Sequence, residues 1–169
     1  MSQIQFVQVS KTFESRDKAV TALRPTSLSS EAGEFVCLLG PSGCGKSTLL
    51  FMLAGLEDPT DGEICLDGEP IAGPGRERGL VFQNYTLFPW LTVKENAAFS
   101  NKLAKNVSGA TEGEVFDRVE RVDYLLDLMG LTPFANAYPR ELSGGMKQRT
   151  AIARTLVNRP KVMLMDEPF

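Results

Sequence analysis

The sequence predicts an α/β fold in a single domain, with strands first, then a helical insert and then a return to a buried strand. Two continuous apolar runs, Glu34–Leu39 and Val162–Met165, are typical of strands that are buried on both faces. A glycine-rich loop separates the first run from Lys46–Ala54, whose composition favours a helix. The 169 residues are enough for one domain with a sizeable core.

The composition is that of an ordinary soluble globular protein, with 43% hydrophobic and 23% charged residues. The net charge of -3 gives no sign of the basic face that nucleic-acid partners usually require, so none is expected. The N-terminus lacks the pattern of a signal peptide, and the longest apolar stretches are too short to cross a bilayer. We therefore expect a cytoplasmic protein that would reach a membrane only by docking onto a partner. Three cysteines without a C-x-x-C pair and without histidine predict no zinc site and no disulfide framework.

Strands are predicted first along the chain. Ile4–Val9 alternates apolar and polar residues, which indicates a half-buried strand. Gly62–Leu66 and Gly79–Phe82 are further short strands, separated by a loop rich in glycine and proline at Asp67–Arg78.

The middle of the chain is predicted to be helical. The expected helices are Thr92–Phe99, Glu114–Met129 with Gly130 as its C-cap, and a helix from Ser143 to about Asn158, while Asn101–Gly113 is polar and flexible in composition. This pattern divides the domain into a β subdomain with a core (residues 1–87), a helical insert (88–142) and a final helix and strand (143–169).

The strongest motif fits the pattern G-x-x-x-x-G-K-[ST] and lies between a predicted strand and a predicted helix, as that pattern requires. Its glycines let backbone N–H groups turn towards phosphate oxygens, and the helix N-terminus adds partial positive charge. Lys46 would contact the β- and γ-phosphates of a nucleotide, and the Ser47 hydroxyl would bind Mg²⁺. The alternative is a glycine-rich turn with a surface lysine. The predicted phosphate-binding residues are Gly40, Pro41, Ser42, Gly43, Cys44, Gly45, Lys46, Ser47 and Thr48.

Two acidic residues follow the apolar run Val162–Met165. Asp166 would hold Mg²⁺ through water, and Glu167 would orient or deprotonate an attacking water as a general base. The alternative is a pair of acids in a solvated loop after a strand.

The segment from Leu142 to Arg149 has the sequence LSGGMKQR. Ser143 is a good N-cap, and Gly144 and Gly145 leave the first N–H groups of the helix open, which makes a second anion site. Helix-capping chemistry alone favours the other interpretation, an ordinary glycine-bearing helix start.

The order and spacing of these three motifs resemble those of the ATP-binding cassette (ABC) ATPases. The resemblance covers essentially the whole chain and implies a P-loop NTPase core with an N-terminal antiparallel β subdomain and a helical insert. It also implies that Gln83 is the glutamine that contacts Mg²⁺ and the attacking water, and that Phe13 stacks on adenine. On their own, Gln83 is more simply a polar loop residue and Phe13 a core residue.

Two further segments, from Pro74 to Gln83 and from Leu87 to Val93, resemble the cassettes of bacterial importers for nitrate, taurine and aliphatic sulfonates. The resemblance implies MgATP hydrolysis at the cytoplasmic face of the inner (plasma) membrane by a peripheral subunit. Its partners would be a membrane permease and a second ATPase subunit, arranged head to tail. Trp90 would pack either on the permease or within the helical insert.

The resemblance also implies more chain after Phe169, so the core is expected to be incomplete at its C-terminal end. A switch histidine should follow, and the sequence contains no histidine. We therefore expect residues 1–169 to bind ATP but to hydrolyse it poorly. The competing predictions are a soluble ABC ATPase that acts outside transport, a non-catalytic nucleotide-binding module and, more distantly, a GTPase or kinase.

Overall fold

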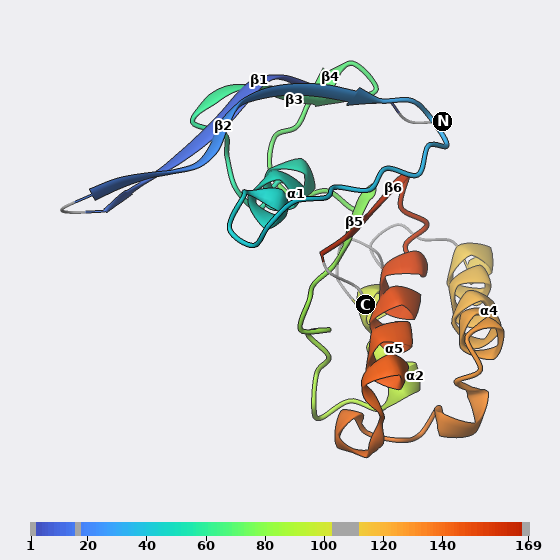
Figure 1. Ribbon diagram of the computed structural model, residues 1–169. Helices are drawn as coiled ribbons and strands as arrows, with labels where there is room; N and C mark the ends of the chain where they lie inside the picture. Colours follow the sequence, from blue (N-terminus) through green and yellow to red (C-terminus); the bar gives the residue numbers. More distant parts are fainter. Residues whose placement is uncertain (1–2, 16–17, 103–111, 167–169) are drawn as a thin grey trace. The chain divides into compact units, whose positions relative to one another are not determined.

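The computed structural model describes residues 3–15, 18–102 and 112–166 (Figure 1). The chain forms two compact units. Of the described residues, those up to Arg78 form the first unit with Lys161–Asp166, and those from Gly79 to Pro160 form the second.

The first unit contains a four-stranded antiparallel sheet with the strand order β2-β1-β3-β4. Its strands are β1 (Ile4–Ser15), β2 (Lys18–Ser30), β3 (Asp61–Leu66) and β4 (Glu69–Pro70). The expected antiparallel β subdomain is thus confirmed. Strand β2 was not predicted from the sequence, because Pro25 argues against a strand unless that strand lies at a sheet edge, as β2 does.

Helix α1 (Lys46–Ala54) has the predicted bounds and lies beside this sheet in Figure 1. It ends at Gly55, whose φ of 74° is left-handed. A Cβ atom at Gly55 would lie 2.0 Å from the Gly73 carbonyl oxygen, so only glycine fits there. The buried side chains of the sheet and helix form the core of the unit: Phe6, Val9, Leu49, Met52, Leu53 and Ile64.

The prediction of a strand at Glu34–Leu39 is wrong. This segment has no regular secondary structure, and the side chains of Phe35 and Leu39 are 93% and 89% exposed. A strand requires a neighbour that accepts and donates its backbone hydrogen bonds, and an apolar run does not specify that neighbour. The second apolar run does form a strand, β6 (Val162–Met165), whose Val162 N–H donates to the Glu77 carbonyl oxygen at 3.0 Å.

The second unit is mainly helical. Strand β5 (Arg78–Val81) lies at the division between the units and confirms the strand expected there. The helices that follow are α2 (Val93–Ala97), η1 (Phe99–Lys102), α4 (Glu112–Leu128), η2 (Thr132–Phe134), η3 (Pro139–Glu141) and α5 (Gly144–Leu156). The predicted helices are therefore present. Residues 103–111 of the polar stretch lie outside the described residues.

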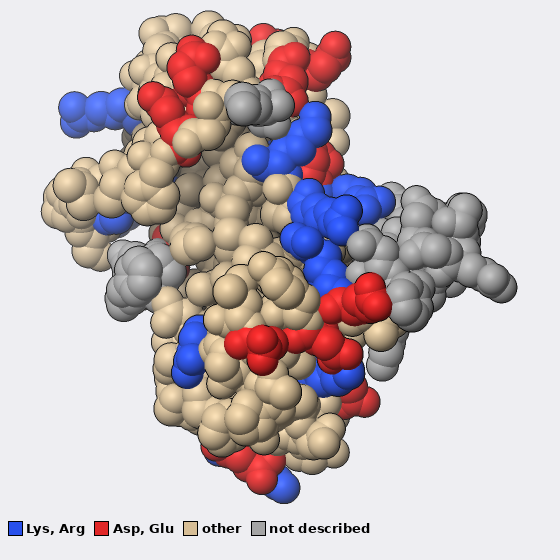
Figure 2. Space-filling model, turned by 90° about the vertical axis from the view of Figure 1, so that its right-hand side faces the viewer, with Lys and Arg blue, Asp and Glu red and all other residues tan. Residues whose placement is uncertain are grey.

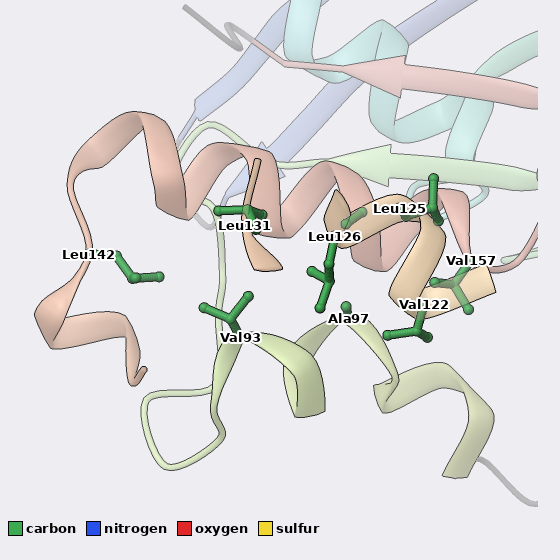
Figure 3. Close-up of a cluster of buried hydrophobic side chains, with 9 residues drawn as sticks. Val93, Ala97, Val122, Leu125, Leu126, Leu131, Leu142 and Val157 are labelled. Carbon is green, nitrogen blue, oxygen red and sulfur yellow. The ribbon is translucent and has the colours of Figure 1, made fainter. Parts of the chain in front are cut away.

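Local signals set the ends of these helices. The Thr92 hydroxyl and the Glu95 carboxylate form a capping box at the start of α2, and Gly130 follows α4 with a φ of 64°. Apolar side chains from α2, α4 and α5 point towards one another in Figure 3. Together with side chains from the segments that flank these helices, they form one buried cluster: Val93, Ala97, Val122, Leu125, Leu126, Leu131, Leu142, Ala153 and Val157.

Charged side chains of both signs lie on the face drawn in Figure 2, in keeping with 18 basic and 21 acidic residues in the sequence. Some form ion pairs, such as Lys161 Nζ with Asp67 Oδ2 at 3.0 Å. Exposed pairs of this kind contribute at most about 1 kcal/mol each, so the apolar clusters are the main source of stability. Among the described residues, no helix is both long enough and apolar enough to span a bilayer.

Candidate nucleotide-binding site

The glycine-rich loop of the first unit depends on left-handed backbone conformations. Gly43 and Gly45 have φ angles of 80° and 95°, which favour glycine. A Cβ atom at Gly45 would also lie 2.5 Å from the Ala22 carbonyl oxygen, so no larger residue fits at the start of α1. The residues from Gly40 to Cys44 are exposed, which leaves the loop and the N-terminus of α1 accessible to an anion.

The Lys46 side chain lies over its own loop. Its Nζ atom donates to the carbonyl oxygens of Gly40 at 2.9 Å and Pro41 at 3.1 Å. These neutral acceptors hold the ammonium group beside the loop amides. Phosphate oxygens would form stronger, charge-assisted bonds with the same group.

Ser47 and Asp166 meet in the first unit although 119 residues separate them. The Ser47 hydroxyl, in the first turn of α1, donates to Asp166 Oδ1 at 2.8 Å, and Asp166 directly follows β6. Asp166 is only 7% exposed. The contact joins the two sequence motifs that were predicted to share a metal ion.

The donor set at this contact suits Mg²⁺, because hydroxyl and carboxylate oxygens are the hard ligands that this ion prefers. Within the described segments, no group of three or more His, Cys, Asp or Glu residues could hold a metal ion. A bound Mg²⁺ would therefore take its remaining ligands from water and from nucleotide oxygens, as is usual for this ion. Glu167, the predicted general base, lies outside the described residues.

Phe13 lies on β1 and is 42% exposed, so it is not a core residue. The Lys11 Nζ atom lies 4.9 Å from the ring centroid, within the range of a cation–π interaction. The same ammonium group donates to the Asp58 carbonyl oxygen at 2.7 Å and pairs with Glu57 Oε2 at 3.1 Å. Lys11 therefore holds the ring beside the loop that follows α1. Sequence reasoning missed Lys11, although its spacing of two residues from Phe13 on one strand was a usable signal.

Replacing Phe13 with alanine is expected to weaken ATP binding about tenfold, since stacking on one base is worth about 1–3 kcal/mol. Calorimetry would compare ATP with inorganic triphosphate, which has no base and should bind the variant as it binds the parent. Phe134→Ala is the matched control, because Phe134 is similarly exposed, at 43%, and lies in the second unit. An equal loss for ATP and triphosphate would contradict the stacking role.

The other predicted site residues belong to the second unit. Ser143 caps α5 by accepting a hydrogen bond from the Met146 N–H at 3.3 Å. Gly144 and Gly145 are exposed, so the first turn of α5 is open to an anion. Gln83 is exposed and follows β5. The structure thus brings Ser47 and Asp166 together in one unit and places Gln83 and Ser143–Gly145 in the other.

Comparisons with known proteins agree with these motifs. The family model described as "ABC transporter" matches residues 23–169. The nitrate import ATP-binding protein NrtD of Synechocystis sp. is 51% identical over 166 residues, which are 98% of this chain and 60% of that protein. The bicarbonate transport ATP-binding protein CmpC of Synechococcus elongatus is 50% identical over 149 residues, 88% of this chain and 22% of that protein.

A solved structure is also similar over nearly the whole chain. It is a dimeric, post-hydrolysis state of the ATP-binding cassette MJ0796 bound to ADP and Pi, with a TM-score of 0.84 and 37% identity. The match covers 98% of this chain and 74% of that one. The chain spans about 60% of the length of the NrtD proteins of Synechocystis sp. and Synechococcus elongatus.

Proposed function

Since the chain belongs to the ABC transporter family, we propose that it is part of an ATPase subunit that hydrolyses MgATP to drive a membrane importer. The observation that carries the proposal is the 2.8 Å hydrogen bond between Ser47 and Asp166, beside an exposed glycine-rich loop. Phosphate-binding loops and a buried acid after a neighbouring strand are the parts that P-loop ATPases use for MgATP.

Each residue of the proposed site has a distinct task. The loop amides and Lys46 would bind the β- and γ-phosphates, and Ser47 and Asp166 would hold Mg²⁺, which neutralises phosphate charge when bound. Gln83 would orient the attacking water, and Glu167 would accept its proton as the water oxygen bonds to the γ-phosphorus. The bond from that phosphorus to the bridging oxygen breaks, and ADP leaves.

The proposed partners are a second ATPase subunit and a membrane permease. Ser143, Gly144 and Gly145 of one subunit would complete the nucleotide site of the other, head to tail, because their open helix start is a second anion site. Support comes from the MJ0796 cassette, which is described as dimeric. Trp90 is 69% exposed and is therefore available for contact with a permease.

The proposed cargo is a small anion such as nitrate, taurine or an aliphatic sulfonate. Relatives that are named for nitrate and bicarbonate import support the class but not one solute. The proposed location is the cytoplasmic face of the inner membrane, where the subunit would be peripheral. Residues 1–169 by themselves would bind MgATP but hydrolyse it slowly, because the sequence supplies no histidine to contact the γ-phosphate.

Binding and phosphate release measured side by side would test this proposal. Residues 1–169 are expected to bind MgATP and to release phosphate about 10²–10³ times more slowly than the whole protein, the usual worth of one phosphate contact. A chain that does not bind ATP would contradict the proposal. Purification of the whole protein with a membrane protein, rather than with DNA or ribosomes, would separate an importer from a soluble ABC ATPase.

A further inference from the structure

The loop that follows Gln83 has an unfavourable backbone conformation. Tyr85 and Thr86 are consecutive non-glycine residues with φ angles of 55° and 46°. Left-handed φ angles are rare outside glycine and are least favourable for β-branched residues such as Thr86. Two short-range hydrogen bonds close the turn: Tyr85 N–H to the Phe82 oxygen at 3.1 Å and Thr86 N–H to the Asn84 oxygen at 2.5 Å.

Arg154, on the face of α5 next to this loop, binds its backbone at the strained residues. Its guanidinium donates to the Thr86 carbonyl oxygen at 2.7 Å, the Thr86 hydroxyl at 3.0 Å and the Tyr85 carbonyl oxygen at 3.2 Å. The guanidinium also lies 5.7 Å from the centroid of the Phe88 ring. Burial lowers the pKa of Arg154, but arginine remains charged in proteins, so these are charge-assisted bonds.

The loop also lies close to the start of α5 and is hydrogen-bonded to α2. A Cβ atom placed on Gly144, at the start of α5, would lie 3.9 Å from the Tyr85 hydroxyl oxygen. The fully buried Asn96 of α2 accepts from the Phe88 N–H at 2.9 Å and donates to the Phe88 carbonyl oxygen at 3.1 Å. The loop is therefore bonded to α5 at Arg154, lies near Gly144 at the start of that helix, and is bonded to α2 at Asn96.

We propose that Arg154 is a positioning residue that fastens the loop from Gln83 to Phe88 (the Gln83 loop) to α5. The loop would then move as one body with this helix. The role of Gln83 in this inference rests on the proposed function. Helix α5 carries Ser143–Gly145 at one end and Arg154 about 16 Å along its axis. Phosphate binding at Ser143–Gly145 would thus act on Gln83 through one rigid helix. Without Arg154, the strained turn at Tyr85 and Thr86 would relax and this link would be lost.

Hydrogen exchange of the unliganded chain directly tests whether Arg154 holds the loop at Tyr85 and Thr86. Arg154→Met keeps an apolar side chain of similar length but removes all hydrogen-bond donors. Arg154→Lys keeps the positive charge but loses the planar guanidinium that donates to several oxygens at once. We expect the protection factors of the Tyr85 and Thr86 amides to fall about tenfold in Arg154→Met and less in Arg154→Lys. Arg121→Met is the matched control, because Arg121 also donates twice to a carbonyl oxygen, that of Leu156, away from the loop.

A second substitution distinguishes local holding of the loop by Arg154 from general destabilisation of the fold. Thr86→Gly removes the conformational cost of the left-handed φ angle. Added to Arg154→Met, it is expected to restore part of the lost protection at Tyr85. Unchanged protection in Arg154→Met, an equal loss in Arg121→Met, or no recovery in the double variant would each overturn the inference.

Nucleotide assays on the whole protein supply a further readout. Because Arg154 makes no proposed contact with ATP, Arg154→Met should lower kcat about tenfold while KM changes less than twofold. A rise in KM at unchanged kcat would overturn the positioning role. If the parent protein neither binds nor hydrolyses ATP, the proposed function fails, and the exchange data still decide whether Arg154 holds the loop.

Discussion

Replacing Lys46 with methionine is expected to weaken MgATP binding by about 100-fold or more, since each hydrogen bond to a charged group contributes about 1.5–3 kcal/mol. The Lys46 ammonium lies over the glycine-rich loop, held by the Gly40 and Pro41 carbonyl oxygens at 2.9 and 3.1 Å. Methionine has a side chain of similar length but cannot donate hydrogen bonds to phosphate oxygens. Titration calorimetry with MgATP would measure the loss.

Lys161→Met is the matched control for this change. Lys161 also lies in the first unit and forms an exposed ion pair with Asp67, at 3.0 Å, but it has no role in the proposed site. Its loss should change ATP affinity less than twofold. Equal effects of the two substitutions would mean that general charge, and not the position of Lys46, determines binding.

Replacing Asp166 with asparagine is expected to remove most of the dependence of ATP binding on Mg²⁺. Asparagine can still accept the hydrogen bond from the Ser47 hydroxyl, but it no longer offers a negative charge to the ion. Two unit charges 4 Å apart interact by about 4 kcal/mol at an effective dielectric constant of 20, so we expect a loss of up to about 1,000-fold in the magnesium-dependent part of the affinity. Affinities measured with Mg²⁺ and with EDTA would give that part separately.

A serine–aspartate pair elsewhere in the same unit provides the control. The Ser10 hydroxyl donates to Asp61 Oδ2 at 3.1 Å, far from the glycine-rich loop in the sequence, so Asp61→Asn should leave the magnesium dependence intact. Ser47→Ala should lower it as well, and the double variant with Asp166→Asn should show less than the sum of the two effects, because the residues are in contact. Strict additivity would indicate that Ser47 and Asp166 do not share an ion.

Much of the fold could be predicted because its signals are local. Helix α1 has the predicted bounds, and α5 begins directly after its predicted cap, Ser143. Such boundaries depend on glycines and capping side chains within one turn of the helix end. The strand expected at Glu34–Leu39 failed because its pairing depends on distant backbone, which an apolar run does not specify.

The residues of the candidate site also divide into those set by local signals and those set by long-range contacts. The sequence alone determined the glycine-rich loop, Lys46 and the acid after β6. The reason is that the lack of a Cβ atom in glycine and the chemistry of phosphate restrict residue types at fixed spacing. Only the tertiary structure decided which side chains meet. Ser47 contacts Asp166 across 119 residues, and Arg154 contacts Thr86 across 68. Lys11 similarly reaches Asp58 across 47 residues. Contacts of this range arise from packing of whole elements, which leaves no repeating pattern in the sequence.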